Sequence, residues 1–161
     1  MEFSTKNVRI WFLSLFLGLL VGWVSTKTVH YPSSRNAPLY ERDLKSLLMN
    51  QSFIAGLGNI YCSEILHDAK ISPLRKTNTL NNSEILGIIK STKKILKRSI
   101  SFGGTTIKNF IVSEEKIGYF KNKLKVYSRD KKKCLRCLKG IVIKKIKQSG
   151  RSTFFCERCQ K

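Results

Sequence analysis

Acidic residues are scarce in this chain. Asp and Glu number 10 against 31 Lys and Arg in 161 residues, so the formal net charge is +21 at pH 7. An excess of this size excludes an indifferent surface and predicts a polyanionic partner, either nucleic acid or an acidic membrane face. The excess is uneven, because residues 51–161 carry +18 and residues 1–50 carry only +3. The hydrophobic content of 42% argues against disorder of the whole chain.

A long apolar run is missing as well. The apolar segment near the N-terminus covers residues 10–24, whereas about 20 apolar residues are needed to cross a membrane. Because Lys6 and Arg9 precede this segment, it is typical of a signal-peptide core or a short anchor. The alternative is a segment foreign to the domain that follows. We therefore expect residues 1–38 to comprise an apolar helix and a linker, with residues 10–24 as the candidate membrane contact.

Cysteine is limited to five residues, and their odd number and clustering argue against a disulfide scaffold. Four of them form two Cys-x2-Cys pairs separated by 18 residues, Cys134/Cys137 and Cys156/Cys159. Each pair places two thiolates on one tight turn, and two such turns close a tetrahedral four-sulfur site of the kind that selects zinc. The pattern predicts one structural Zn2+, with two disulfides or an iron–sulfur cluster as weaker alternatives. The fifth cysteine, Cys62, is expected to be a small buried residue.

The middle of the chain carries helical patterns with start and stop signals. Apolar residues from residue 39 onward indicate a first helix, which breaks at the glycines of residues 56–58. Asn59 is placed to be the N-cap of a second helix, which ends before the Ser-Pro pair at residues 72–73. A third helix begins with a capping-box pattern, Asn81-x-x-Glu84, and ends at the glycine pair 103–104. The lysine-rich outer face of this helix fits either a solvated surface or a polyanion contact.

Strand patterns replace helical ones towards the C-terminus. Residues 105–120 are expected to form a long loop and residues 123–127 a short strand. The β-prone runs 140–143 and 153–155 meet around residues 148–150, which predicts a hairpin between the two cysteine pairs. Residues 121–161 hold fifteen basic and two acidic side chains, a net charge of +13, which favours a hairpin that grips phosphates. A lysine-rich but merely solvated surface is the alternative.

Several segments, taken in order, resemble a known family. They read QSFIAGLGNIYCSEIL, SFGGTTIKNF, GYFKNKLKVYSR, the four-cysteine pattern and GRSTFFCERCQK. This order is similar to the C-terminal half of formamidopyrimidine-DNA glycosylases, over residues 46–161. The resemblance implies a mainly α fold, with a helix–two-turn–helix bundle in residues 39–120 and a C-terminal β-hairpin zinc ribbon in residues 121–161. The 18-residue spacer between the cysteine pairs is slightly longer than is usual in that family.

The resemblance also implies roles for particular residues. Asn59, next to Gly58 in the GLGN turn, is expected to hold phosphates beside a lesion. Arg151 in the hairpin is expected to grip the same backbone and, as in the family, to assist δ-elimination. Tyr127 and Arg129 are expected to contact DNA. The loop that closes over an everted oxidised purine is expected in residues 105–119, and its candidate residues are Thr105, Thr106, Gly118 and Tyr119.

The largest departure from the family lies at the N-terminus. Family members begin with Met-Pro-Glu, and the proline amine is the nucleophile that forms a Schiff base with the sugar. This chain begins Met1-Glu2-Phe3-Ser4, and Glu2 is expected to keep Met1 in place. No residue matches the family's nucleophile, its acid or the lysine of its N-terminal β-sandwich. The glycosylase/AP lyase activity of the family is therefore not expected from this chain alone.

The combined expectation is a monomeric, truncated relative that binds damaged or abasic double-stranded DNA during base excision repair of oxidised purines, in the cytoplasm or nucleoid. The first alternative is a membrane-tethered or exported nucleic-acid-binding zinc module without catalysis, with the N-terminal apolar segment as its anchor. The second is the product of a gene fragment with no stable function.

Overall fold

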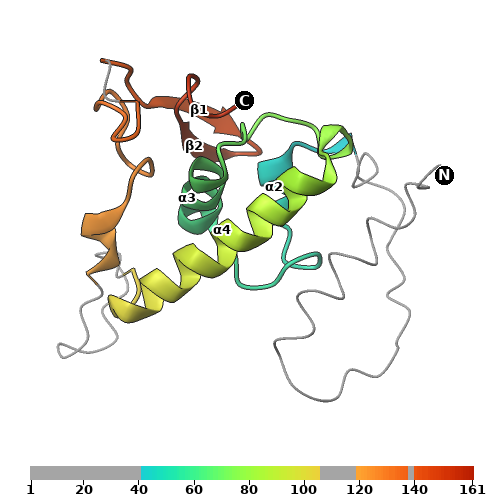
Figure 1. The fold of residues 1–161 in the computed structure, drawn as a ribbon, viewed down its shortest axis with the longest axis horizontal. Coiled ribbons are helices and arrows are strands. Elements are labelled where there is room, and N and C mark those ends of the chain that lie inside the picture. The colour runs from blue at the N-terminus through green and yellow to red at the C-terminus, as the bar shows by residue number, and fades with distance from the viewer. Residues whose placement is uncertain (1–40, 106–118, 138–139) are drawn as a thin grey trace. The chain divides into compact units, whose positions relative to one another are not determined.

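The computed structural model describes residues 41–105, 119–137 and 140–161. Within these residues it contains three α-helices and a two-stranded antiparallel hairpin (Figure 1), in agreement with a helical bundle followed by a zinc ribbon. The helices are α2 (Leu44–Leu48), α3 (Asn59–Ala69) and α4 (Asn82–Ser101), and the strands are β1 (Lys144–Gln148) and β2 (Arg151–Phe155). Two short 3-10 helices are η2 (Thr77–Thr79) and η3 (Phe120–Lys123). No helix among the described residues combines the length and apolarity that a membrane crossing requires, and the apolar helix expected in residues 10–24 lies outside the described residues.

The first predicted helix is shorter than its apolar pattern suggested, because α2 ends at residue 48 and turns follow it. The side chain of Gln51 organises these turns: its Nε2 donates to the Leu57 carbonyl at 2.9 Å, and its Oε1 accepts from the Gly56 N–H at 2.9 Å. Gly56 has φ +88°, a left-handed conformation that favours glycine. The turns thereby deliver the chain to the start of α3.

Asn59 is not the N-cap of the second helix. Gly58 holds that position, and Asn59 is the first residue of α3. The Asn59 side chain instead donates from Nδ2 to the carbonyl oxygen of Ser152 at 3.0 Å, across 93 residues of sequence. A local capping pattern was therefore overridden by a contact with the hairpin.

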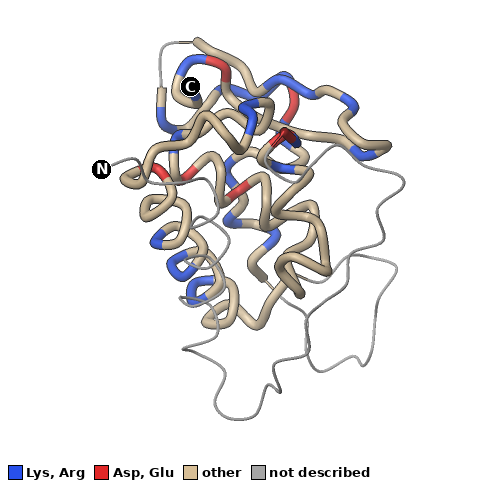
Figure 2. Tube along the Cα trace, turned by 90° about the vertical axis from the view of Figure 1, so that its right-hand side faces the viewer, with Lys and Arg blue, Asp and Glu red and all other residues tan. Residues whose placement is uncertain are grey.

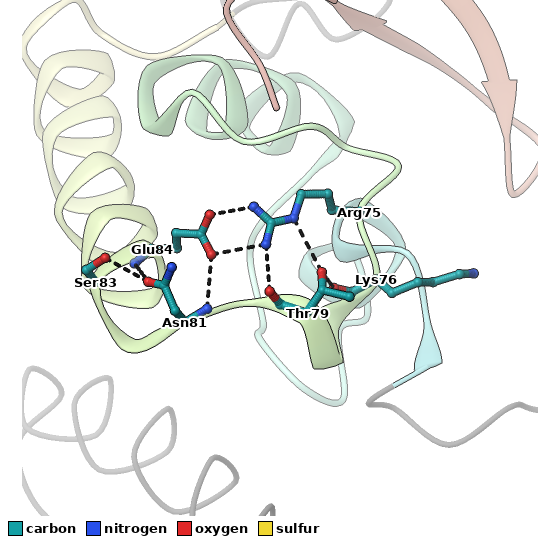
Figure 3. A network of polar contacts seen from close by, with 6 residues as sticks. All are labelled: Arg75, Lys76, Thr79, Asn81, Ser83 and Glu84. Carbon is teal, nitrogen blue, oxygen red and sulfur yellow. Dashed lines mark hydrogen bonds and ion pairs between the residues drawn. The ribbon is translucent and has the colours of Figure 1, made fainter.

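The capping box at the start of α4 is confirmed (Figure 3). The Asn81 side chain accepts from the Glu84 N–H, and the Glu84 carboxylate accepts from the Asn81 N–H. Arg75 joins this cap through two guanidinium nitrogens that bind the Glu84 carboxylate. These hydrogen bonds from Arg75, and then the one from the Asn81 backbone, lower the pKa of Glu84.

The strand predicted at residues 123–127 is absent. Residues 120–123 form η3, and the next segment runs without a strand partner. Its backbone N–H groups at Lys125, Val126 and Tyr127 all donate to the carboxylate of Glu64 on α3, at 2.9–3.0 Å. Glu64 is 1% exposed, so a single buried side chain supplies the acceptors that a neighbouring strand would otherwise provide.

The predicted hairpin is present, with its first strand shifted. β1 starts at Lys144 rather than within residues 140–143, while Val142 and Ile143 make isolated bridges to residues 133 and 130. The strands turn through Ser149 and Gly150, whose φ angles of 48° and 76° fit a two-residue type I′ turn. This turn places Arg151 opposite Gln148 at the tip of the hairpin.

Helix α3 is the central element, because it packs against both α4 and β2 (Figure 1). One apolar core lies among the helices and η3, and a second lies beneath the hairpin around two of the zinc-pattern cysteines. Lys and Arg recur along the outer turns of α4 and through the C-terminal segment, whereas acidic residues are few (Figure 2). Helix α3 therefore links the other helices of the bundle to the basic zinc finger.

Candidate nucleic-acid interface and zinc site

The four cysteines of the two Cys-x2-Cys pairs lie together, with all sulfur atoms within 4.8 Å of one another. Two sulfur pairs cross between the knuckles: Cys134 to Cys159 at 3.9 Å and Cys137 to Cys156 at 3.6 Å. A tetrahedral zinc site with Zn–S bonds of about 2.3 Å requires sulfur separations of roughly 3.8 Å. The distances fit zinc, and no disulfide joins the cysteines, so the structure supports the metal site rather than the two-disulfide alternative.

The electrostatics of this cluster also call for a cation. Burial, and then the neighbouring sulfurs, raises the pKa of Cys159 above its ordinary value. Four thiolates at these separations repel one another, and a divalent metal removes that repulsion by coordinating all four. The four cysteines therefore form one structural zinc site, with every tetrahedral position filled by protein and none left open for substrate.

The C-terminal end of α3 abuts the first zinc knuckle. The Nε2 atom of His67 lies 3.7 Å from the Cys134 sulfur, and His67 is fully buried. Arg136, between the two cysteines of this knuckle, donates to the carbonyl oxygens of His67 and Asp68. Burial, followed by the charges of Arg136 and Lys125, lowers the pKa of His67 to about 4.

The N-terminal half of the bundle meets the hairpin through a buried polar network. Lys45 on α2 donates from Nζ to Thr153 Oγ1 at 2.7 Å and to the Ser152 carbonyl at 3.3 Å. Thr153 donates in turn to Gln148 Oε1 at 3.0 Å. The Gln148 amide donates to Asp43 and to the carbonyl of residue 73, which joins the hairpin tip to the start of α2.

Lys45 is an unusual lysine, because its side chain is only 1% exposed. Desolvation lowers its pKa to about 8, the Cys62 thiol acts in the opposite direction, and the positive charge of Arg151 lowers it further. The same burial raises the pKa of Cys62 to about 12, which keeps that thiol neutral. Cys62 is 0% exposed, as expected from its position in the sequence.

The candidate DNA-binding residues lie around this junction. Arg151 is exposed at the hairpin tip, and its neighbour Ser152 accepts from Asn59. Gly58 is the N-cap of α3, so the free N–H groups of the first turn of α3 also open near this point. Tyr127 packs edge-on against Phe154 of the hairpin, with ring centroids 5.0 Å apart. The structure therefore brings three expected residues, Gly58, Asn59 and Arg151, to one place.

A pocket of about 500 Å³ lies beside the segment that follows η3. It is lined by two of the expected contact residues, Tyr127 and Arg129, and by the cations Lys121 and Lys132. The Nε atom of Arg129 is buried and has no hydrogen-bond partner among the described residues. A pocket lined by three cationic side chains suits an anionic ligand.

The expected lesion loop is described only at its base. Thr105 and Tyr119 pair there in an antiparallel bridge, supported by a hydrogen bond from the Tyr119 N–H to the Phe102 carbonyl at 3.0 Å. Thr105 also lines the pocket. The other two residues expected in the loop, Thr106 and Gly118, lie outside the described residues.

Two family models match the chain. The model of the formamidopyrimidine-DNA glycosylase H2TH domain matches residues 27–111, and that of the zinc finger found in FPG and IleRS matches residues 131–161. The chain belongs to the formamidopyrimidine-DNA glycosylase family. The resemblance noted in the sequence is thereby confirmed, as is the zinc-finger type.

Individual relatives agree with this membership. The formamidopyrimidine-DNA glycosylase of Rickettsia bellii is 48% identical over 118 residues, which are 73% of this chain and 42% of the relative. That of Listeria monocytogenes is 43% identical over 120 residues, or 74% of this chain and 43% of the relative. The chain thus spans less than half the length of the curated relatives that it matches.

Solved structures of the family also align with the fold. A Lactococcus lactis FPG variant in complex with DNA containing Fapy-dG has a TM-score of 0.69 at 40% identity, covering 75% of this chain and 44% of that one. The L. lactis protein bound to DNA with an abasic site has a TM-score of 0.68, with the same identity and coverage. MutM bound to DNA containing carbocyclic 8-oxo-G has a TM-score of 0.66 at 40% identity, covering 75% of this chain and 43% of that one.

Three buried polar residues of this family member did not stand out in the sequence. Lys45, Glu64 and His67 each lie in a helix beside apolar residues, and each is at most 1% exposed. Their partners are 61 to 108 residues away in the sequence. In the sequence, only a charged or imidazole side chain next to apolar helical positions indicates such a buried residue. This pattern does not identify its hydrogen-bond partner.

Proposed function

We propose that this chain binds double-stranded DNA at damaged or abasic sites, as the helix–two-turn–helix and zinc-finger portion of a base-excision DNA glycosylase/AP lyase acting on oxidised purines. The observation that supports it best is the junction at the N-terminus of α3. There an exposed arginine on a basic hairpin, Arg151, stands beside Asn59 and the free N–H groups of a helix start. Helix N-termini and guanidinium groups both favour phosphate.

Electrostatics support a phosphate-directed partner. Residues 121–161 carry a net charge of +13, and the exposed cations of the hairpin within them include Lys145, Lys147 and Arg151. Most of the affinity would then come from release of counterions from the DNA backbone, so binding weakens steeply as salt rises. Contacts of this kind position a protein without specifying the DNA sequence.

The pocket lined by Tyr127 and Arg129 is the proposed second contact region. Tyr127 and Arg129 line this pocket together with Lys121 and Lys132, and these cations are proposed to attract phosphate. The lesion-loop residues Thr105, Thr106, Gly118 and Tyr119 are proposed to close over the everted base. Eversion costs least where the base is already damaged or missing, which favours damaged and abasic sites.

Catalysis by the chain alone is not part of this proposal. Arg151 is assigned the family's assisting role in δ-elimination, but no residue is assigned as the nucleophile that must attack the sugar. Location in the cytoplasm or nucleoid, as a monomer, is the expectation that accompanies DNA repair.

The DNA-binding proposal is tested with the zinc-loaded full chain and a duplex that carries a tetrahydrofuran abasic analogue, by fluorescence anisotropy at two salt concentrations. Arg151→Ala is expected to weaken binding by about 10- to 150-fold, the range of a hydrogen bond to a charged group. The matched control is Arg158→Ala, which removes an exposed arginine from the second zinc knuckle, away from the hairpin tip. We expect the control to lose about threefold or less, because an exposed charge away from the DNA is screened. Equal losses in both variants, or affinity that ignores salt, contradict the proposal.

A further inference from the structure

His67 takes no part in the proposed DNA contacts, yet it is among the most buried side chains of the protein, at 0% exposed. It lies in the last turn of α3 and belongs to the helical bundle rather than to the zinc finger. Its ring nevertheless contacts the four-cysteine cluster, because Nε2 is 3.7 Å from the sulfur of Cys134. Imidazole-to-sulfur contacts of this length are hydrogen bonds whose direction depends on where the proton sits.

The surroundings of the ring decide that direction. Nδ1 is buried and has no hydrogen-bond partner among the described residues. If Nδ1 carried the proton, an N–H donor would be left buried and unpaired, at a cost of about 1–3 kcal/mol. Nε2 would then present a lone pair to a metal-bound thiolate, which is itself an acceptor. With the proton on Nε2 both problems disappear, because the N–H meets the sulfur and only a lone pair remains unpaired at Nδ1.

The position of the ring is fixed by the same knuckle that it contacts. Arg136 donates to the carbonyl oxygens of His67 and Asp68, and therefore ties the end of α3 to the turn between Cys134 and Cys137. The Lys70 N–H also donates to the His67 carbonyl, at 3.2 Å. These hydrogen bonds fix the backbone of His67, and they thereby hold its imidazole beside the Cys134 sulfur.

A zinc ion with four thiolates carries a net charge of −2 in a largely buried site, and such charge is stabilised by N–H donors to sulfur. In the second knuckle, backbone N–H groups of residues 158 and 159 donate to the Cys156 sulfur. At the Cys134 sulfur, the nitrogen within hydrogen-bond distance is His67 Nε2, which lies outside the zinc finger. We propose that His67 donates its Nε2–H to the Cys134 thiolate as an outer-sphere partner of the zinc, which makes α3 a direct support of the metal site.

This assignment has two chemical consequences. The hydrogen bond withdraws electron density from the sulfur, so that Cys134 is less reactive towards electrophiles and its charge-transfer transition to a bound metal lies at higher energy. It also holds the sulfur in its coordinating orientation, and loss of outer-sphere partners typically weakens metal binding by about 10- to 100-fold. His67 is therefore a positioning residue for zinc rather than a ligand.

The test compares His67→Phe, which fills the site without an N–H group, with His67→Gln, which retains an N–H donor. Cys62→Ala is the matched control, because it changes another fully buried residue of α3 outside the cysteine cluster. Each full-length protein is loaded with Co2+, and its sulfur-to-metal charge-transfer band is recorded. Zinc affinity is then measured by competition with a chromogenic chelator, and circular dichroism checks the helices.

In His67→Phe we expect the charge-transfer band to move to lower energy and zinc affinity to fall by about 10- to 100-fold. His67→Gln should restore both at least in part, and Cys62→Ala should leave both unchanged. An unchanged band in a folded His67→Phe protein overturns the proposal. So does an equal loss in the Phe and Gln variants, because that result shows a packing role alone.

A measurement on the unaltered protein keeps the proposal testable if His67→Phe does not fold. With 113Cd in the site and 15N-labelled histidine, the pattern of ring nitrogen shifts reports the tautomer, and a scalar coupling between the metal and the Nε2 proton reports the hydrogen bond. We expect the Nε2–H tautomer and a detectable coupling. A proton on Nδ1 overturns the assignment.

Discussion

The two ends of α3 differ in how completely their backbone groups are used. At the C-terminal end, the carbonyl of His67 accepts from both the Lys70 N–H and Arg136, that of Leu66 accepts from the Ile71 N–H, and that of Asp68 accepts from Arg136. At the N-terminal end, Gly58 caps the helix without a side-chain hydrogen bond. The closed end faces the zinc site, and the open end faces the tip of the basic hairpin.

This difference follows the charge of the helix ends. The C-terminus of a helix carries partial negative charge, which suits the guanidinium of Arg136, whereas the N-terminus carries partial positive charge and free N–H groups. The open end therefore suits phosphate, and the closed end lies beside the zinc site, where Arg136 compensates the negative charge. A helix 11 residues long therefore joins the zinc site at one end to the proposed binding surface at the other.

The largest effect is expected from removing zinc at the closed end. Binding of structural zinc is worth about 10–16 kcal/mol in modules of this type at pH 7. A strong chelator should unfold residues 121–161 and abolish DNA binding, because Arg151 and its strand lose their support. The capping box and the core of the helices do not depend on the metal, so most helical circular dichroism should persist.

Metal analysis of the purified chain tests the assignment of the zinc ligands directly. We expect one zinc per chain, lost together with the hairpin in a Cys137→Ser/Cys156→Ser double variant. The matched control is Cys62→Ala, which removes the fifth cysteine and should leave the metal content at one. Full metal content in the double variant contradicts the ligand assignment.

The second largest effect is expected at Glu64, midway between the two ends. Its carboxylate accepts from three consecutive backbone N–H groups in residues 125–127, and Glu64→Ala leaves these buried donors unpaired at about 1–3 kcal/mol each. We expect a loss of roughly 3–5 kcal/mol in the free energy of unfolding, measured by urea denaturation with zinc present. Glu64→Gln retains one acceptor oxygen and should lose less.

The control for Glu64 is another carboxylate that binds backbone N–H groups, Glu84 in the capping box. Its side chain is 24% exposed, so water can replace it, and Glu84→Ala should cost about 1 kcal/mol. Comparable losses in the free energy of unfolding at Glu64 and Glu84 would show that burial does not strengthen the hydrogen bonds to residues 125–127.

Local chemistry explains what the sequence could predict. The zinc ligands, the capping box of Asn81 and Glu84, and the turn at Ser149 and Gly150 each depend on residues close together in the chain. The cysteine pairs are farther apart, but their spacing within each knuckle carries the information. These features were confirmed because no distant residue competes for the same groups.

Distant contacts explain the failures. The strand expected at residues 123–127 is absent because Glu64 takes its N–H groups, and Asn59 leaves the N-cap position to Gly58 because Ser152 accepts from its side chain. Lys45 and His67 are polar residues whose burial depends on segments 67 to 108 residues away. No periodicity or spacing around these residues encodes such partners.

The third effect concerns the contribution of Lys45 to stability, which depends on pH. Burial lowers its pKa to about 8 from the ordinary 10.5, so between these values the unfolded chain holds a proton that the folded chain has released. Stability relative to Lys45→Met should therefore rise with pH across that window, by about 3 kcal/mol in total. Urea denaturation of both proteins at pH 7 to 10, with zinc present, measures the difference, in which the other lysines cancel. A difference in the free energy of unfolding that stays constant or falls over this range contradicts the lowered pKa of Lys45.

The smallest effect is expected at Asn59, where the open end touches the hairpin. Asn59→Ala removes the hydrogen bond from Nδ2 to the Ser152 carbonyl, but it also removes the Oδ1 atom, which is buried without a partner among the described residues. These terms oppose each other, so the free energy of unfolding should change by less than about 1 kcal/mol. Binding to abasic DNA should weaken severalfold, because the strand that carries Arg151 loses its tie to α3.

A double-mutant cycle with Arg151→Ala separates two roles for Asn59. If Asn59 acts by positioning the hairpin, its substitution costs less when Arg151 is already absent, and the coupling should be about 0.5–1 kcal/mol, a value typical of residues that share a partner segment. If Asn59 holds a phosphate of its own, the two losses add. We expect coupling, because its amide already donates to the residue next to Arg151. Strict additivity, measured by anisotropy at one salt concentration, assigns Asn59 to the DNA backbone alone and leaves Arg151 to be held by Lys45 and Thr153.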